Sequence, residues 1–293
     1  MDREIVAIDA HRCNRCGLCV EVCPRSIIEL GEESAGIKAP QRCILCGHCK
    51  AVCPEDAVIH YTLDPNEFAP VLPKDQIPDP ETLLAFFRSR RSIRFFKPEP
   101  VAQPLLEKII QAGRFTPSGG NRQPVHFLVL QTPECINHLR QEIHSFLRQE
   151  AEAVLEAQER HRKFGEPLPP RAEVKLGYAP LWLRMGKLFE MGKDLLFYYA
   201  PVIFVLYLDP EKASPFGVDA GLAAMQMVLM AESLELGTCF SGFLSTALNS
   251  SPQLKSLVRI PAAHQVLVSF MTGHPDIRFQ RTVARKPAQV TYL

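Results

Sequence analysis

Eight of the ten cysteines in this 293-residue chain lie between Cys13 and Cys53, and their spacing repeats. Each half of the segment reads C-x2-C-x2-C-x3-C-P, and the second half follows the first at an offset of 30 residues. The glycine inside the motif repeats with it, because Gly17 recurs as Gly47. The apolar pair after each Cys-Pro predicts one short strand in each half.

The spacing has a chemical reason. A cubane iron–sulfur cluster needs four thiolates, and three cysteines at x2 spacing on one tight loop can reach three of its irons. Glycine relieves crowding in such a loop because it adopts backbone angles that are closed to other residues. The fourth cysteine, before proline, ligates the cluster of the other half. We therefore predict two [4Fe–4S] clusters. One set of ligands is Cys13, Cys16, Cys19 and Cys53, and the other is Cys43, Cys46, Cys49 and Cys23.

Zinc is the alternative metal, since two four-cysteine zinc sites would also use eight thiolates. Zinc does not require three cysteines at x2 spacing followed by x3 and Cys-Pro, so the pattern favours iron and sulfur. The segment resembles bacterial two-cluster ferredoxins over its whole length. Two clusters would also stabilise a segment of about sixty residues, which is too short to build a good hydrophobic core.

Prolines are frequent after this segment, at five positions between Asp64 and Pro80. Proline restricts the backbone and removes hydrogen-bond donors, so we predict an extended, semi-rigid linker. Val71, Leu72 and Ile77 are expected to be buried against the domain that follows. The predicted organisation is a ferredoxin-like domain at 1–62, a linker at 63–80 and a second domain at 81–293.

The second domain begins with a predicted helix at Asp79-Pro80-Glu81, where a capping side chain precedes a proline and an acid. Helices and strands then interleave, which predicts an α/β or α+β sandwich. The predicted strands are Val125–Leu130, Pro201–Leu208, a short one near Cys239, and Leu267–Thr272. The predicted helices are 103–112, a long and mostly helical insert between the first two strands, and an apolar helix from Asp219 to Leu236.

Four short motifs in this domain contain residues that bind polar ligands. Their segments are RRSIRFF (90–96), TPSGGNRQPVHF (116–127), LGTCFSGF (236–243) and RKP (285–287). Guanidinium groups suit phosphate, and glycine-rich loops offer backbone donors. Taken singly, each motif is also compatible with a solvated helix end or an ordinary loop. The isolated Cys135 and Cys239 are expected to be buried as small hydrophobic residues.

Together, in this order, the motifs resemble the FMN-binding nitroreductase family over about residues 81–293. The resemblance implies an α+β fold with a three-layer α-β-α FMN-binding domain. It implies FMN contacts from the early segment at Arg90, Arg91, Ser92 and Arg94. It implies contacts with the partner subunit's flavin from Pro117, Ser118, Gly119, Asn121 and Gln123. It implies ring contacts at Ser241 and Gly242 and a phosphate contact at Arg285. The family often has two glycines where this chain has Ser241-Gly242.

The family resemblance also implies an obligate homodimer with flavin sites at the interface. Net charge is +1, which gives no reason to expect nucleic acid or an anionic membrane as a partner. The first residues are charged where a signal peptide needs an apolar core, and the longest apolar stretch is too short to span a bilayer. We therefore expect a cytoplasmic protein.

The leading functional hypothesis is an FMN-dependent oxidoreductase. Two [4Fe–4S] clusters would pass single electrons to FMN, which would reduce a nitroaromatic, a quinone or a similar small unsaturated compound. The expected electron donor is a reduced ferredoxin or a similar protein. Two alternatives stay open: an electron-transfer module that serves a protein partner, and an iron–sulfur redox sensor. The sequence does not identify a catalytic proton donor.

Overall fold

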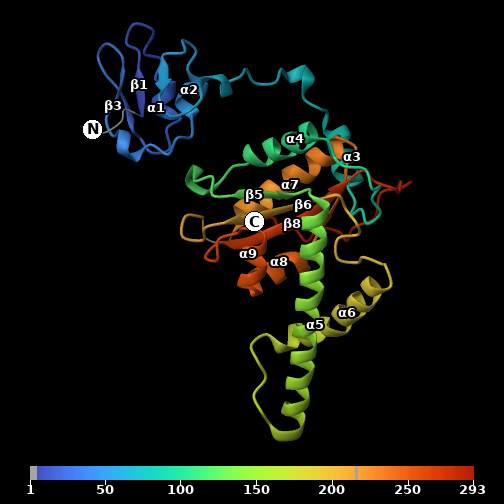
Figure 1. The fold of residues 1–293 in the computed structure, drawn as a ribbon. Coiled ribbons are helices and arrows are strands. Elements are labelled where there is room, and N and C mark those ends of the chain that lie inside the picture. The colour runs from blue at the N-terminus through green and yellow to red at the C-terminus, as the bar shows by residue number, and fades with distance from the viewer. Residues whose placement is uncertain (1–4, 215–216) are drawn as a thin grey trace. The chain divides into compact units, whose positions relative to one another are not determined.

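The computed structural model describes residues 5–214 and 217–293, and the chain forms two compact units (Figure 1). The first unit extends to Asp79 and also includes Gly120–Arg122. The second unit comprises Pro80–Gly119 and Gln123–Leu293. Each unit has its own secondary structure and its own hydrophobic core.

The first unit is built from the two halves of the cysteine repeat. The strands expected after each Cys-Pro are present as β2 (Ile28–Leu30) and β4 (Val58–His60). Each pairs in an antiparallel manner with a strand that the sequence did not predict, β2 with β3 (Ala35–Ile37) and β4 with β1 (Val6–Ile8). Each half also has a short helix, α1 (Leu18–Glu21) or α2 (His48–Val52).

The two motif glycines adopt backbone angles that are closed to most other residues, as the sequence predicted. Gly17 and Gly47 precede α1 and α2 with φ of 78° and 72°, a left-handed conformation that costs other residues energy. The core of the first unit is small, and the cysteines form part of it. Its buried residues are Val6, Cys19, Ile27, Ile28, Ala35, Cys49 and Val58.

The proline-rich segment contains two 3-10 turns, Pro65–Glu67 and Lys74–Gln76. Asp64 caps the first turn by accepting a hydrogen bond from the Asn66 N–H at 2.9 Å. The expectation that the apolar side chains of this segment are buried is wrong, because Val71, Leu72 and Ile77 are all exposed. Fixed proline angles and local turns hold this segment without burial of those side chains.

The second unit contains one antiparallel sheet with the strand order β5-β6-β8-β7. Its strands are β5 (His126–Leu130), β6 (Val202–Leu208), β7 (Gly237–Phe240) and β8 (Gln265–Gly273). Ser92 adds a single parallel bridge to Thr238 on β7. The predicted strands are confirmed, with boundaries that shift by a few residues.

Helices cover both faces of this sheet, which confirms the α+β prediction. One core joins β6 side chains such as Phe204 to α4 (Gln103–Arg114) and α7 (Val218–Ser233). The other core joins the alternate side chains Ile203 and Val205 to helices on the opposite face. Those helices are α5 (Pro133–Phe164), α6 (Ala172–Glu190), α8 (Gly242–Ser250) and α9 (Pro252–Leu257). The remaining helix, α3 (Pro80–Ser89), starts at the predicted proline.

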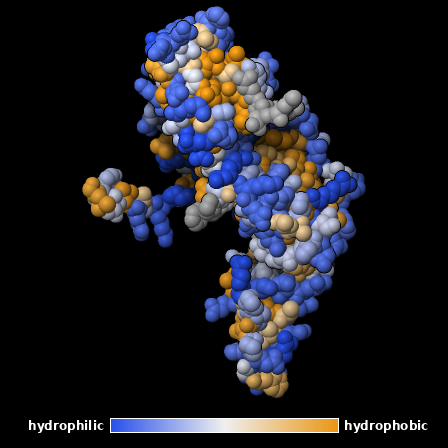
Figure 2. All heavy atoms as spheres, turned by 90° about the vertical axis from the view of Figure 1, so that its left-hand side faces the viewer, coloured by the Kyte–Doolittle hydropathy of each residue, from blue (hydrophilic) through white to orange (hydrophobic). Residues whose placement is uncertain are grey.

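The predicted helical insert is the pair α5 and α6. The buried positions of α5 run from Ile136 to Val154, so its first two thirds pack on the core and its last turns extend beyond it. In Figure 2 this part of the molecule points downward, and it shows hydrophilic side chains along its length with hydrophobic ones at its tip. Within the described residues, no helix combines the length and apolar character that a bilayer span requires.

Candidate functional site

The eight motif cysteines line two cavities in the first unit, and each cavity takes one cysteine from the opposite half of the repeat. We name the two sets cage A and cage B. Cage A consists of Cys13, Cys16, Cys19 and Cys53. Cage B consists of Cys43, Cys46, Cys49 and Cys23. The crossed grouping is therefore the one expected from the spacing of the motif.

Electrostatics within the cages suit a cationic cluster. Burial raises the pKa of the Cys49 thiol to about 11, and the other cage B cysteines add to the rise. Burial also raises the pKa of Cys19, followed by repulsion from Cys13, Cys53 and Cys16. Four thiolates in one partly buried cavity repel one another unless bound metal offsets their charge. An iron–sulfur cluster fits this donor set.

Backbone amides donate to sulfur in both cages. The Ala57 N–H donates to Cys53 Sγ at 3.2 Å, and the Ala35 N–H donates to Cys13 Sγ at 3.4 Å. In cage B, the Ile27 N–H donates to Cys23 Sγ at 3.5 Å. Hydrogen bonds to the sulfurs are among the features that set the potential of a bound cluster.

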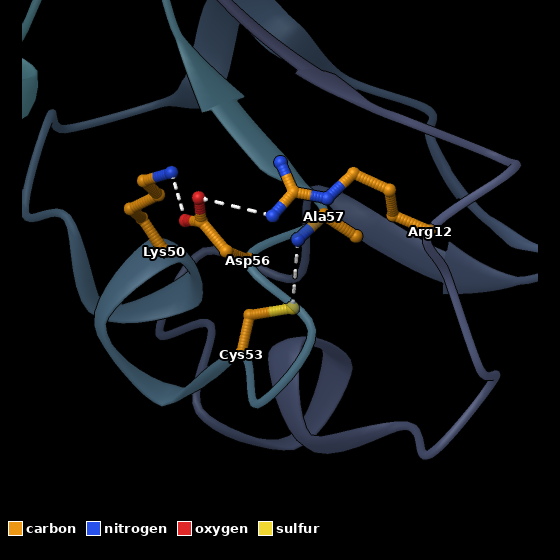
Figure 3. Close-up of polar contacts among 5 residues, drawn as sticks. All are labelled: Arg12, Lys50, Cys53, Asp56 and Ala57. Carbon is orange, nitrogen blue, oxygen red and sulfur yellow. Dashed lines mark hydrogen bonds and ion pairs between the residues drawn. The ribbon is translucent and has the colours of Figure 1, made fainter.

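Asp56 holds the turn next to Cys53 in place (Figure 3). Its carboxylate accepts from Lys50 and from Arg12, the latter at 3.3 Å. The Lys50 hydrogen bond is the main cause of the lowered pKa of Asp56. Asp56 has φ of 50°, and it directly precedes Ala57, whose N–H reaches the cage A sulfur. Sequence reasoning missed this contact, because Arg12 and Asp56 lie 44 residues apart.

In the second unit, arginines from both ends of the domain line one cavity. The predicted residues Arg90, Arg91 and Arg285 all contribute to it, together with Phe87, Arg88, Val283 and Ala284. Arg91 Nη1 donates to the Arg90 carbonyl. Arg90 Nη1 and Arg91 Nε and Nη2 are buried without a hydrogen-bond partner among the described residues. Buried guanidinium donors without partners are costly, so this cavity suits an anion such as the phosphate of FMN.

Ser92 and Arg94 lie beside β7. The Ile93 N–H between them donates to the Thr238 carbonyl at 2.8 Å, which fixes this segment along the strand. Cys239 on β7 is buried, as the sequence predicted, and Cys135 is half-buried. Burial raises the pKa of Cys239, while Arg94, Ser92 and Arg90 oppose that rise.

Arg94 also contacts a turn that the sequence did not single out. Its guanidinium carbon lies 5.8 Å from the centre of the Tyr198 ring. Tyr198 and Tyr199 both have positive φ, a strained conformation for these residues. Asp194 braces the turn by accepting three backbone N–H groups, from Leu196, Phe197 and Tyr199.

The loop at 116–123 is held by a hydrogen bond within the loop and by one to the start of α7. Ser118 Oγ accepts from the Gln123 N–H at 2.9 Å, and the Gly119 N–H donates to Asp219 Oδ1 at 3.2 Å. Pro117, Ser118 and Gln123 line a cavity with Asp219. Asn121 belongs to the first unit, where its amide donates to the carbonyls of Ile44 and Leu45 at 3.0 and 2.9 Å. Asp219 was not predicted as a site residue, although an acid in the first turn of an apolar helix is a visible signal.

Ser241 and Gly242 lie where β7 meets α8. The Ser241 N–H donates to the Ser269 carbonyl at 2.8 Å, and its hydroxyl caps α8 by accepting from the Leu244 N–H at 3.4 Å. A Cβ built on Gly242 would meet no atom within 4 Å. Ser241 therefore has a structural role of its own, and the space beside Gly242 is open.

Comparisons with known proteins agree with this division of the chain. A family model described as "Nitroreductase family" matches residues 87–274, and a model described as "4Fe-4S dicluster domain" matches residues 12–57. A 4-nitrobenzoate reductase from Pseudomonas putida is 25% identical over 70% of this chain and 91% of its own length. An iodotyrosine deiodinase from Danio rerio is 22% identical over 67% of this chain and 60% of its own length.

Solved structures show the same fold for the larger unit. A nitroreductase with bound FMN from Bacteroides fragilis aligns with a TM-score of 0.53 at 18% identity, covering 72% of this chain and 98% of that one. A nitroreductase with bound FMN from Desulfitobacterium hafniense aligns with a TM-score of 0.51 at 25% identity, covering 72% and 97%.

Proposed function

This chain belongs to the nitroreductase family and carries a 4Fe-4S dicluster domain ahead of the family region, and from this premise we propose how the oxidoreductase operates. The proposal is an iron–sulfur flavoprotein with a cluster in each cage and FMN in the second unit. When bound, the clusters supply single electrons and FMN supplies an electron pair to a small organic acceptor.

One observation carries the proposal: two four-thiol cages and an anion-binding cavity with unpaired buried guanidinium donors occur in the same chain. Arg90, Arg91 and Arg285 would hold the FMN phosphate. Ser92 and Arg94 would bind the polar edge of the flavin, and Gly242 would leave room beside the ring. The D. hafniense and B. fragilis relatives were solved with FMN, which supports the choice of flavin.

We propose that the protein is a homodimer in which one subunit completes the flavin site of the other. The loop residues Pro117, Ser118, Gly119, Asn121 and Gln123 would contact the partner's flavin. Two features support this arrangement. The cavity lined by this loop is distinct from the arginine-lined cavity of the same chain. Leu222 and Met225 are exposed apolar side chains on α7, a helix whose other face is buried against the core.

The proposed acceptor is a nitroaromatic acid, because the P. putida relative is named for 4-nitrobenzoate. A reduced ferredoxin or a similar one-electron donor would supply the electrons, since [4Fe–4S] clusters held by the cages would accept electrons singly. The cytoplasm is the proposed compartment, because cluster ligands must stay reduced thiols and disulfides rarely form there.

Anaerobic titration of the purified full-length protein tests this function. We expect about eight iron atoms and one FMN per chain, and stepwise reduction should bleach the cluster absorbance and the flavin absorbance. Addition of 4-nitrobenzoate to the reduced protein should reoxidise both chromophores. Zinc in place of iron, or a second unit without affinity for FMN, would overturn the proposal.

A variant pair tests the arginine-lined cavity. Arg91→Ala should weaken FMN binding about tenfold to a hundredfold, because charge-assisted hydrogen bonds to phosphate are lost. Arg162→Ala is the matched control, because Arg162 is an exposed arginine at the end of α5. If Arg91→Ala binds FMN with wild-type affinity, the assignment of the FMN phosphate to this cavity is wrong.

A further inference from the structure

The two halves of the cysteine repeat differ at several positions that line a cage, and one of these positions places a side chain against a cysteine sulfur. Residues 30 apart correspond, so the counterpart of His60 at the end of β4 is Leu30 at the end of β2. Leu30 is exposed, whereas His60 is half-buried and lines the cage B cavity. One half therefore has a polar, partly buried side chain where the other half has an exposed aliphatic one.

The imidazole of His60 reaches a cluster ligand. Its Nε2 lies 3.5 Å from Cys49 Sγ, within hydrogen-bond distance for sulfur. A thiolate bound to iron has no proton to give, so the imidazole must be the donor and carries its proton on Nε2. Nδ1 is buried without a partner among the described residues, so Cys49 is the partner that the structure provides for this ring.

Neighbouring side chains hold the ring in this orientation. The Phe68 ring stacks on His60 with a centroid distance of 6.4 Å and an interplanar angle of 19°. Phe68 also covers Gly47, where an added Cβ would meet the Phe68 ring at 3.1 Å and Leu63 at 3.5 Å. The corresponding Gly17 has no atom within 4 Å of that position. Side chains from the start of the linker therefore pack against Gly47 of cage B, and one of them also stacks on His60.

We propose that His60 tunes the reduction potential of the cage B cluster through an Nε2–H hydrogen bond to Cys49 Sγ. In the part of the chain that the structure describes, the donors to cage A sulfurs are backbone N–H groups. The inference rests on the proposed function, because it requires a cluster in cage B. Hydrogen bonds to cluster sulfurs raise the potential, since they stabilise the negative charge that reduction adds. Cage A receives its additional donor from the Ala35 backbone instead. The two clusters are thereby tuned by separate groups.

The test is an anaerobic redox titration of the full-length protein followed by EPR. His60→Leu, which copies the residue at position 30, should lower one of the two cluster potentials and leave the other unchanged. The expected change is about tenfold in the one-electron equilibrium constant, or about 59 mV. His60→Gln, which keeps a side-chain N–H donor, should restore much of the difference.

His48→Leu is the matched control, because His48 lines the same cavity and is exposed. Both potentials should match the wild type in that variant. Equal shifts in His48→Leu and His60→Leu would overturn the assignment to the sulfur hydrogen bond. Unchanged potentials in a His60→Leu protein that retains both clusters would also overturn it.

A measurement on the unmutated protein covers the case in which His60→Leu loses iron. Pulsed EPR of protein labelled with [15N]histidine should show a histidine nitrogen coupled to one of the two reduced clusters. The coupling should persist in His48→Leu, and its absence in the wild type would overturn the inference. Protein without eight irons would instead contradict the proposed function itself, so the two failures are distinguishable.

Discussion

The two units differ in how their sites are encoded. In the first unit, the eight cysteines of the two cages all lie in the segment from Cys13 to Cys53, and their spacing alone groups them. In the second unit, the arginine-lined cavity joins Arg90 to Arg285, roughly 195 residues further along the chain. A cluster needs several ligands on one tight loop, whereas a flavin site can take single residues from distant elements. A site whose residues lie close together in the sequence can therefore be recognised from the sequence, whereas a site assembled from distant residues requires the structure.

The units also differ in what stabilises them. The core of the first unit consists of a few small apolar residues and the cysteines themselves. The second unit has a packed core on each face of its sheet. We therefore expect the first unit to depend on metal for its fold, and the second to depend on side-chain packing.

Removal of one ligand should give the largest effect. Cys49→Ala should lose the cage B cluster, about half of the iron, and the ordered structure of the first unit, because metal binding and folding are coupled there. The second unit should keep its secondary structure by circular dichroism. Cys135→Ala, a half-buried cysteine on α5, is the control and should retain all the iron. Full iron content in Cys49→Ala would contradict the assignment of Cys49 as a cluster ligand.

The second prediction concerns a buried ion pair in the second unit. Arg140 Nε lies 2.8 Å from Asp194 Oδ2, and both side chains are almost fully buried. Asp194→Ala leaves the Arg140 charge without its partner and should reduce the free energy of unfolding by about 3–5 kcal/mol. Denaturant unfolding of the second unit measures this, while the cluster absorbance should not change. Glu159→Ala, at the exposed C-terminal end of α5, is the control. An equal loss of stability in that variant would contradict the special role of the buried pair.

A pair of glycine variants sharpens the comparison inside the first unit. Gly17→Ala and Gly47→Ala both place a side chain at positive φ, which costs about 1–2 kcal/mol. Gly47→Ala should cost more, because its Cβ would meet the Phe68 ring at 3.1 Å. The rate of iron release in denaturant reports the difference. Equal rates of iron release in the two variants would mean that the Phe68 ring moves away from the added methyl group with no loss of stability.

The smallest expected effect is a pH dependence of the second unit. His144 is buried and stacks on Phe189, with both ring nitrogens unpartnered among the described residues. Burial lowers the pKa of His144; Asp194 opposes this, and Arg140 and Arg148 add to it. The unfolded chain therefore binds the proton more tightly, so stability should fall as pH drops below about 6.5. His144→Phe, which keeps the ring stack, should flatten that part of the unfolding-free-energy curve, and an unchanged slope would contradict the assignment.

Several elements of the fold could not be predicted from the sequence, and the reason is physical. Strands β1 and β3 are three residues long, and β1 pairs with β4 from the other end of the first unit. Short strands carry little periodic signal of their own, and their partners define them. Helices α8 and α9 were missed as well, although Ser241 and Ser251 cap them. The strands and helices of the second unit that carry longer apolar patterns were predicted with small boundary shifts.

The sequence by itself determined the cysteine sets, the glycines at left-handed positions and the elements of the sheet. These properties depend on spacing and periodicity, which are local. Only the tertiary structure decided that Arg90, Arg91 and Arg285 share a cavity, that Arg140 and Asp194 form a buried pair, and that His60 reaches Cys49. Each of these contacts forms because folding buries side chains from distant parts of the sequence next to one another. Neither the spacing of residues nor the composition contains that information.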